Sequence, residues 1–316
     1  MSSIRKIVVS APGKLILAGE YAVLRGGLAV AAAVKRRAIA FVVDRDPARA
    51  AGLTPFLAAA ARVLEERAND ATAAAIVREA IVVDSTALRS DDSKLGLGSS
   101  AAVTVAAIGA ALIASGGPLR RDLVHTLARA AHLHAQGGRG SGADITAATF
   151  GGTLWVREGA HGPLALPAAT WIPLWTGRPA DTVSLIRAVE AARDARPAAV
   201  DTACDRIAAA AQALSDATSD VEAIAAIDLG GDAIVELAAA AHLDLETDPV
   251  RAARRVARRL GGAVKTCGAG GGDLAIACLP AGTEVTSVTQ AFLETGCTPL
   301  DLPFDPRGVD IDPPGD

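Results

Sequence analysis

Aromatic residues and cysteines are scarce in this 316-residue chain. Phe, Trp and Tyr make up 3% of the residues, so the sequence does not favour an aromatic-lined groove. The four cysteines form no CxxC pair, which disfavours a zinc site or a redox centre. Hydrophobic residues nevertheless account for 51% of the chain, and much of this share is alanine. A sizeable core of closely packed, alanine-rich helices is therefore expected, in two domains or one large one.

A strong net charge, a long apolar run and a signal peptide are also missing. The 31 Lys and Arg residues against 35 Asp and Glu residues leave a net charge of −4, which argues against a general nucleic-acid binder. Arg, Asp and Glu interrupt the alanine-rich runs at helical spacing, so no segment is typical of a membrane span. Residues 1–6 lead into a short strand-like run rather than a signal-peptide core. We expect a cytoplasmic protein with reduced thiols, monomeric or homodimeric, with neither nucleic acid nor a membrane as its partner.

A glycine-rich loop is the most informative stretch of the sequence. It reads KLGLGSSAA over residues 94–102 and opens into an apolar, proline-free run at 103–115 that predicts a buried helix. Gly96 and Gly98 let backbone amides converge, and the helix start adds unpaired N–H groups and the positive end of a dipole. These features favour a phosphate site, with Lys94 as a nearby cation. A glycine turn capped by one of the serines is the alternative, and the spacing is not that of a P-loop.

The opening of the chain is rich in predicted strands. Three apolar runs predict them, at residues 4–10, 28–34 and 38–43. A sharp turn is expected at the Ala-Pro-Gly-Lys sequence of residues 11–14. Lys14 on this turn is placed to point into a cleft, and Glu20 follows it after an apolar segment. A surface lysine and a surface glutamate are the simpler interpretation of these two residues taken alone.

A second glycine-rich stretch reads QGGRGSGAD over residues 136–144 and follows a predicted helix. Asp144 ends the stretch where a small-residue helix begins, so it is either an N-cap or a general base beside a phosphate site. Arg139, inside the glycine run, suits an anionic oxygen of a substrate. His132 and His134 precede it, but at that spacing they face different sides of a helix, and no metal site is expected there.

A third glycine cluster reads CGAGGGD over residues 267–273 and precedes an apolar strand at 274–279. Its backbone amides can approach a ligand closely, although the cluster is also typical of a hairpin turn. Between residues 183 and 260 the pattern is almost entirely helical. Breaks in that helical pattern are expected at 196–197, 215–220, 230–231 and 247–249.

Four further features carry weaker signals. Arg178 follows a Trp-Thr-Gly turn and is either an anion contact or a solvated arginine. Five arginines between residues 251 and 259 are spaced as one exposed helical stripe, which we prefer to a nucleic-acid patch. Residues 158–167 show little pattern, and the Pro- and Asp-rich tail at 299–316 is expected to be loose.

The three glycine motifs, in this order and at these separations, resemble those of the GHMP small-molecule kinases. The first is APGK with GEY over residues 11–21, the second is GLGSSAA at 96–102, and the third is GAGGGD at 268–273. The resemblance covers nearly the whole chain. It implies an α+β fold with ATP and Mg²⁺ between two domains. These would be a ribosomal-protein-S5-like domain over residues 1–168 and a ferredoxin-like domain over residues 169–316.

Within this family the sequence is most similar to the phosphomevalonate kinase branch. The similarity rests on AQG at 135–137, GSGAD at 140–144 and the Trp-Thr-Gly turn at 175–177. Mevalonate kinases tend to carry a magnesium-binding glutamate before the aspartate, and this chain has no acid there. Departures from the branch are Cys267 in place of serine, Arg139 in place of lysine and Asp181 in place of a small residue.

The resemblance implies ATP-dependent phosphorylation of (R)-5-phosphomevalonate to 5-diphosphomevalonate. A mevalonate kinase, another small-molecule kinase of the family, or a catalytically silent ligand-binding relative are the alternatives. The implied catalytic residues are Lys14, Lys94 and Asp144, and the implied Mg²⁺ contact is Ser100. The ATP phosphates would bind Gly96, Leu97, Gly98, Ser99, Ser100 and Ala101. The small phosphorylated substrate would contact Glu20, Tyr21, Arg139, Ser141, Gly142, Arg178, Gly270 and Gly271.

Overall fold

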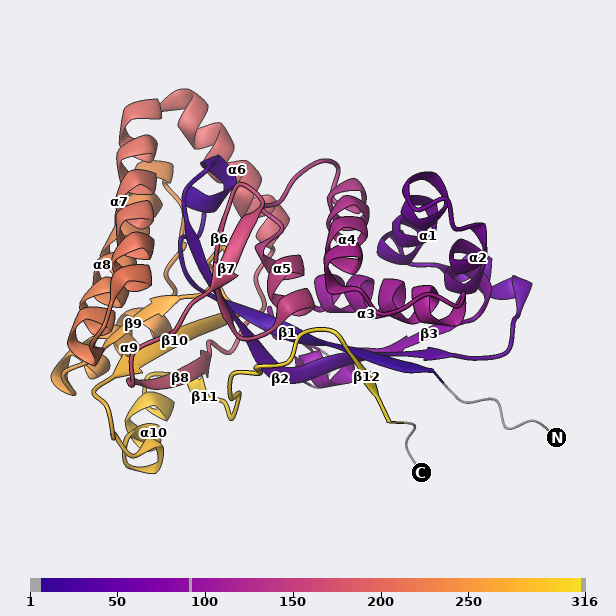
Figure 1. Cartoon of the computed structure of the whole chain (residues 1–316). Helices are drawn as coiled ribbons and strands as arrows, with labels where there is room; N and C mark the ends of the chain where they lie inside the picture. The colour runs from indigo at the N-terminus through magenta and orange to yellow at the C-terminus, as the bar shows by residue number, and fades with distance from the viewer. Residues whose placement is uncertain (1–6, 91–92, 314–316) are drawn as a thin grey trace.

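The computed structural model describes residues 7–90 and 93–313. Figure 1 shows two sheets that lie beside each other, each with helices packed against it. Both sheets are antiparallel and the helices are interspersed among the strands, so the fold is of the α+β class. No helix within the described ranges is long and apolar enough to cross a membrane.

The first sheet has the strand order β12-β1-β2-β6-β7, and β3 pairs with one end of β2. Its strands are β1 (Val8–Ala18), β2 (Ala29–Val42), β3 (Ile81–Asp84), β6 (Thr153–Arg157), β7 (Ala160–Pro163) and β12 (Asp310–Asp312). Long β1 and β2 form its centre, and most of their Val, Leu and Ala side chains are fully buried. Strand β7 lies within residues 158–167, where the sequence showed little pattern. It forms there because a tight turn at Gly159 brings the chain back to pair with β6.

Two expectations for β1 and β2 are wrong. Pro12 and Gly13 do not form a sharp turn, because they lie inside β1 at a shift of register. Such a bulge accommodates proline, which has no N–H to donate to the ladder. The two strands expected at 28–34 and 38–43 are one continuous strand, since Arg37 still pairs with Pro12 across the irregularity.

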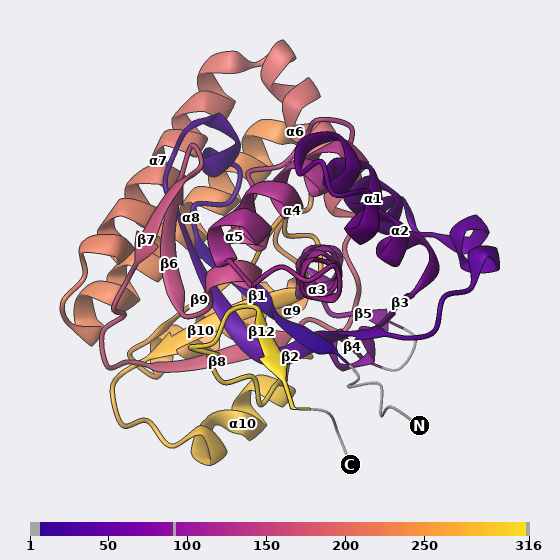
Figure 2. The same cartoon turned by 45° about the vertical axis from the view of Figure 1, so that its right-hand side comes forward.

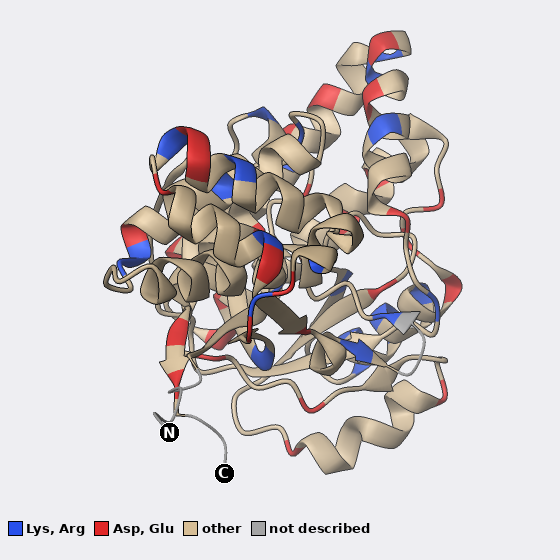
Figure 3. Cartoon of the chain, turned by 90° about the vertical axis from the view of Figure 1, so that its right-hand side faces the viewer, with Lys and Arg blue, Asp and Glu red and all other residues tan. Residues whose placement is uncertain are grey.

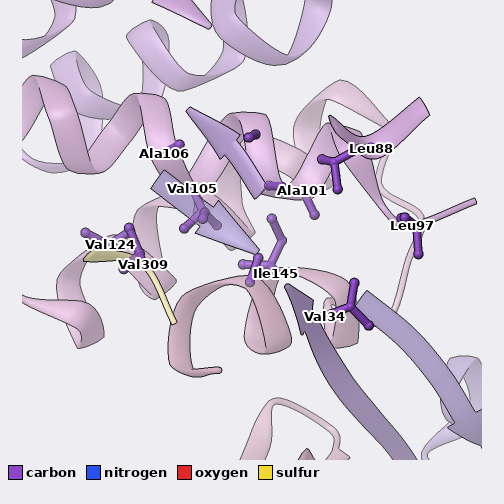
Figure 4. Close-up of a cluster of buried hydrophobic side chains, with 14 of the residues drawn as sticks. Val34, Leu88, Leu97, Ala101, Val105, Ala106, Val124, Ile145 and Val309 are labelled. Carbon is purple, nitrogen blue, oxygen red and sulfur yellow. The ribbon is translucent and has the colours of Figure 1, made fainter. Parts of the chain in front are cut away.

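Alanine-rich helix α3 (Ser99–Ala114) is the centre of the first core. It packs against β1 and β2 and is surrounded by four other helices. These are α1 (Pro55–Arg67), α2 (Ala71–Glu79), α4 (Arg121–Ala135) and α5 (Ala143–Phe150) (Figure 2). Figure 4 shows side chains from separate segments meeting in this core, among them Val34, Leu97, Ala101, Ile145 and Val309. Because Leu97 is buried here, the core anchors the glycine loop that precedes α3.

Short elements connect these parts of the first region. Three are 3₁₀ helices, η1 (Ala22–Arg25), η2 (Pro47–Gly52) and η3 (Thr86–Leu88). A small hairpin of β4 (Arg89–Ser90) and β5 (Ser93–Lys94) leads directly into the glycine loop.

The second sheet has the order β11-β8-β10-β9 and is covered by long helices. Its strands are β8 (Thr170–Trp175), β9 (Ala263–Thr266), β10 (Leu274–Leu279) and β11 (Thr298–Pro299). The helices are α6 (Thr182–Ala195), α7 (Pro197–Asp216), α8 (Asp220–Ala241), α9 (Asp248–Arg259) and α10 (Val285–Leu293). Helices α8 and α9 pack on β9, and α7 packs along α8. The proposed division at residues 168 and 169 stays a prediction, although the strands of this sheet all follow it in sequence.

The helix break expected at Gly230 and Gly231 is wrong, because α8 continues through both. These glycines leave room for two buried charged side chains. A Cβ on Gly230 would lie 3.3 Å from Cδ of Lys265, and one on Gly231 would lie 3.1 Å from the guanidinium of Arg254. Close packing, rather than a helix end, therefore explains the glycine pair.

The arginine stripe on α9 is also not fully exposed. Arg254 is buried and bonds Glu246 at 3.2 Å, while its neighbour Arg258 pairs with Asp228 and Asp232. These arginines fasten α9 to α8 and are not a free basic surface. Segments of both charge signs are interspersed over the helices and loops in Figure 3, in line with the small net charge.

The expectation of a loose C-terminal tail is wrong for residues 299–313. Strand β12 pairs with β1, and Val309 is fully buried. Asp305 is also buried and forms an ion pair with Arg37 of β2 at 2.5 Å. A partner 268 positions away in sequence makes this segment ordered, which its local composition does not indicate.

Candidate active site

Strand β1 carries Lys14 to the glycine loop. The backbone N–H of Lys14 donates to the carbonyl of Leu97 at 2.9 Å, and its Nζ donates to the carbonyl of Gly96 at 3.1 Å. The lysine is thus held along the loop by two hydrogen bonds. It remains partly exposed, so its ammonium group is accessible from the cavity described below.

Glycines let other groups approach this loop closely. Gly96 and Gly98 have φ of 72° and 70°, in the left-handed region that favours glycine. A Cβ on Gly98 would lie 3.0 Å from the Lys14 side chain, and one on Gly96 would lie 2.6 Å from Asp273. Asp273 therefore brings the third glycine cluster next to the second. The family resemblance implied that these clusters share one site, but it did not indicate which residues meet.

The start of α3 is open to an anion. Helix α3 begins at Ser99, and its N-cap residue, Gly98, has no side chain to cap the first turn. The amides of this turn, together with the helix dipole, form the kind of site that binds phosphate groups. The side chains of Leu97 and Ala101 are buried in the core, so only their backbone can contribute to such a site.

Asp144 lies in the first turn of α5. The N-cap of this helix is Gly142, so the N-cap interpretation of Asp144 is wrong. Its Oδ1 accepts a hydrogen bond from the Ile145 N–H at 2.9 Å, and its Oδ2 lies 3.7 Å from Nε2 of His132. That same nitrogen is 3.0 Å from Oγ of Ser100, so the histidine stands between the two predicted site residues. Sequence reasoning missed His132, because it considered the histidines only as metal ligands.

A cavity of about 180 Å³ brings together two of the three predicted catalytic residues, whereas exposed Lys94 does not line it. Lys14 and Asp144 both line it, from β1 and α5. Its wall also includes apolar side chains from η1 and α6, and backbone from the third glycine cluster. The lining contains, besides the two catalytic candidates, Ile16, Glu20, Tyr21, Val23, Leu24, Gln136, Arg139, Gly140, Ser141, Ala143, Thr182, Val183, Ile186, Gly268 and Ala269.

Glu20 and Tyr21 fix the floor of the cavity to the second sheet. The Glu20 carboxylate forms a buried ion pair with Lys265 of β9, and the Tyr21 hydroxyl donates to the carbonyl of Ala269 at 2.6 Å. Burial raises the pKa of the Tyr21 hydroxyl, with the Glu20 charge adding to the effect. Lys265 is among the largest fully buried side chains of the described residues, and sequence reasoning did not select it.

The remaining predicted substrate residues are divided between the cavity and its surroundings. Arg139 and Ser141 line the cavity, and exposed Arg139 lies 3.9 Å from Glu190. Arg178 is outside the lining and bonds the carbonyl of Gly271 at 3.0 Å and Asp244 at 3.1 Å. Gly270 and Gly271 are outside the lining and pack against the segment at 244–245, so they support the third loop rather than line the cavity.

Two groups near the loop, one half-buried and one buried, have shifted pKa values. Burial raises the pKa of the Asp273 carboxyl, although the Ala180 N–H and the charges of Lys14 and Lys94 oppose this rise. Burial raises the pKa of the Cys267 thiol to about 12, so it is protonated at neutral pH and unsuited to nucleophilic chemistry. Lys94 thus acts electrostatically on Asp273 from the neighbouring hairpin.

The oxygen donors at this site fit a nucleotide-bound magnesium ion better than a protein-bound metal. Among the described residues, no group of three or more His, Cys, Asp or Glu side chains is placed to hold a metal. Ser100 Oγ and Asp144 Oδ2 are both oxygens, which Mg²⁺ prefers, and they converge on His132. Mg²⁺ commonly takes one or two such ligands and completes its shell with phosphates and water.

Comparison with known proteins identifies the family. Residues 56–152 match the model of the GHMP kinases N terminal domain. A phosphomevalonate kinase of Streptomyces sp. (strain CL190) is 30% identical, with 94% of this chain and 97% of the relative covered. The chain belongs to the GHMP kinase family. A mevalonate kinase of Aeropyrum pernix is likewise 30% identical, with 90% of this chain and 94% of the relative covered.

Solved structures confirm the GHMP kinase fold. A Lin0012 protein from Listeria innocua superposes with a TM-score of 0.85 at 24% identity, covering 97% of this chain and 99% of that one. The Streptococcus pneumoniae phosphomevalonate kinase in complex with phosphomevalonate and AMPPNP superposes with a TM-score of 0.73 at 17% identity, over 94% and 99% of the two chains. As a GHMP kinase, the chain is a phosphotransferase of a family that uses ATP, and the α+β fold expected from its glycine motifs is confirmed.

Proposed function

We propose that this GHMP kinase transfers the γ-phosphoryl group of ATP to the phosphate of (R)-5-phosphomevalonate, giving 5-diphosphomevalonate. The observation that supports a kinase centre is the common cavity of Lys14 and Asp144, with Lys14 hydrogen-bonded to the glycine loop that opens into α3. The choice of acceptor draws on the Streptomyces relative, a phosphomevalonate kinase that this chain matches over nearly its full length. We also propose a cytoplasmic location for the enzyme.

The loop and the two lysines would act on the phosphate chain of ATP. Backbone amides of residues 96–101 would bind its oxygens, and Lys14 would stabilise the charge on the transferring group from the opposite side of the loop. Lys94 would add positive potential from the adjoining hairpin. Mg²⁺, when bound, would neutralise the phosphate charge, with Ser100 as its protein ligand.

Asp144 would orient the acceptor rather than act as a strong base. A phosphate monoester has a second pKa near 6, so at neutral pH its attacking oxygen is largely ionised. That oxygen forms a bond to the γ-phosphorus while the bond to the β–γ bridging oxygen breaks, and ADP leaves. No proton has to be removed at the moment of transfer, so charge neutralisation by Lys14 outweighs proton abstraction by Asp144.

Two kinds of contact would hold the acceptor. Charged groups at the rim, Arg139 and more remotely Arg178, would bind its anionic ends. Glu20, which lines the cavity, would accept a hydrogen bond from a substrate donor that reaches its buried Oε2, an atom without a hydrogen-bond partner among the described residues. The backbone and small side chains that would close around the substrate belong to Tyr21, Ser141, Gly142, Gly270 and Gly271.

Mevalonate phosphorylation is the second candidate function. The Aeropyrum relative supports it, since it is a mevalonate kinase with the same percentage identity. A hydroxyl acceptor has a proton to lose, so in this case Asp144 would have to act as a base. The two functions therefore differ in how much the reaction depends on Asp144.

Steady-state kinetics with ATP and each acceptor, followed by ADP release, test the proposal. We expect kcat/KM for (R)-5-phosphomevalonate to exceed that for (R)-mevalonate by at least about 10²-fold. Mevalonate has no phosphate group, so the cationic side chains of the site would lack their partner when it binds. Lys14→Met should lower kcat by about 10²- to 10³-fold. Asp144→Asn should lower it less if the acceptor is a phosphate. A preference for mevalonate would overturn the acceptor, and near-normal kcat in both variants would remove the proposed centre.

A further inference from the structure

We propose that His132 is a positioning residue that sets the nucleotide-side Ser100 and the acceptor-side Asp144 relative to each other. This inference rests on the proposed kinase centre but not on the identity of the acceptor. One imidazole nitrogen, Nε2, lies 3.0 Å from Ser100 Oγ and 3.7 Å from Asp144 Oδ2. The three residues come from α3, α4 and α5, so one ring connects the helices that carry the two halves of the reaction.

The imidazole is itself held in place. Its side chain is only 4% exposed, so water does not compete for Nε2. Phe56 of α1 stacks on the ring, with centroids 5.0 Å apart and planes inclined by 27°. A ring that is packed on its face and bonded at its edge has little freedom to turn. It can therefore transmit a fixed position to both of its neighbours.

Each neighbour depends on this contact for its orientation. The Ser100 hydroxyl is a freely rotating group unless a partner fixes it, and His132 is that partner. Asp144 already uses Oδ1 to accept the Ile145 N–H, so Oδ2 is the oxygen whose surroundings His132 determines. At 3.7 Å this second contact is electrostatic rather than a hydrogen bond. His132 lies outside the lining of the main cavity, so it acts through these two residues and not on the substrate.

The same helix provides a matched control. His125 lies two turns before His132 on α4, and its Nε2 is 3.0 Å from Oγ1 of Thr146 on α5. It is buried as well, and its ring packs against Phe150 and His161. The chemistry, helix pair and burial are thus alike. The difference is in the partner on α5, because Asp144 lines the cavity and Thr146 does not.

The experiment compares His132→Ala, His132→Gln, His125→Ala and His125→Gln. For each we would measure the melting temperature, kcat, both KM values and the affinity for AMPPNP by calorimetry, with and without Mg²⁺. His132→Ala should lower kcat by about 10²-fold, the effect of a small misplacement of reacting groups. His132→Gln should recover about tenfold of this, because its amide can again bond the Ser100 hydroxyl. His125→Ala should lower the melting temperature comparably but change kcat by less than about twofold.

The calorimetric measurements keep the inference separate from the proposed acceptor. AMPPNP affinity should fall several-fold in His132→Ala and stay unchanged in both His125 variants, even if phosphomevalonate is not the substrate. The inference is overturned if His132→Ala keeps normal kcat and AMPPNP affinity. It is also overturned if the His125 and His132 variants lose activity equally, since that would show a merely structural role for both.

Discussion

Two buried ion pairs fasten late segments of the chain to the first sheet, one far from the cavity and one beside it. In the remote pair, Arg37 of β2 bonds Asp305 at 2.5 Å. The same guanidinium donates to Ser10 Oγ at 2.8 Å and to the carbonyls of Ser10 and Gly308 at 3.0 and 2.6 Å. The other Asp305 oxygen accepts the Arg307 N–H at 2.9 Å. Every charged atom of this pair thus has a partner.

The pair beside the cavity is less complete. Lys265 donates to Glu20 Oε1 and to the carbonyl of Thr266 at 2.7 Å, and the two charged side chains are only 1% and 2% exposed. Glu20 Oε2 has no partner among the described residues, although it is buried. Buried acceptors without partners are rare and costly in native proteins. The remote pair is therefore fully satisfied, whereas the pair beside the cavity leaves one buried acceptor, Glu20 Oε2, without a partner among the described residues.

The largest effect that would sharpen this contrast is expected from Lys265→Met. It leaves the Glu20 carboxylate buried without a counter-charge, which should lower the free energy of unfolding by about 3–5 kcal/mol. Urea unfolding measures the loss. Exposed Lys35→Met serves as the control and should change stability by less than about 0.5 kcal/mol. A loss below about 1 kcal/mol in Lys265→Met would mean that Glu20 is not charged or not truly buried.

Arg37→Met should destabilise the protein by a similar amount, about 3 kcal/mol, because it leaves Asp305 uncompensated. Its kcat/KM should nevertheless stay within about twofold of the wild type, since no residue of this network lines the cavity. Kinetics well below the unfolding temperature, with the folded fraction checked by circular dichroism, test this separation. A large fall in kcat at full folding would break the comparison.

Neutral double variants separate charge from function at both sites. Glu20→Gln combined with Lys265→Met should regain about 2 kcal/mol over Lys265→Met alone, since no buried charge remains. Relative to the wild type, the KM of this double variant for the acceptor should be about tenfold higher, because an amide accepts a hydrogen bond less strongly than a carboxylate. Arg37→Met combined with Asp305→Asn should regain stability with no change in KM. If Glu20→Gln combined with Lys265→Met had the KM of the wild type, Glu20 would have only a structural role.

Local patterns were sufficient for much of the fold and for the centre of the site. Glycine clusters and helix periodicity predicted the loop before α3 and most helices of the second region. They also selected Lys14 and Asp144, which the fold brings into one cavity. These features are local, because a glycine turn and an amphipathic helix are specified by neighbouring residues.

The errors arose where a distant residue decides the outcome. Arg37 lies inside a strand because Asp305 and Gly308 satisfy its charge from the end of the chain. Gly230 lies inside a helix, where its small size leaves room for the Lys265 side chain. His132 gained its place in the site from Ser100 and Phe56, which are remote in sequence. Such contacts follow from tertiary packing, and a single sequence carries no local signal for them.

Acid provides the smallest expected effect, at His125, a buried group that does not line the cavity. Burial lowers the pKa of His125 from 6.5 to about 4, and the charges of His161 and Arg129 add to this effect. Between these values the unfolded chain binds a proton that the folded protein does not, so stability falls as pH falls from about 6.5 towards 4. The wild type should lose about 2 kcal/mol relative to His125→Gln between pH 7 and pH 4.5. Parallel urea unfolding curves at the two pH values measure this difference. Equal losses in both proteins would show that His125 takes up its proton in the folded state, and that burial alone does not keep this site neutral.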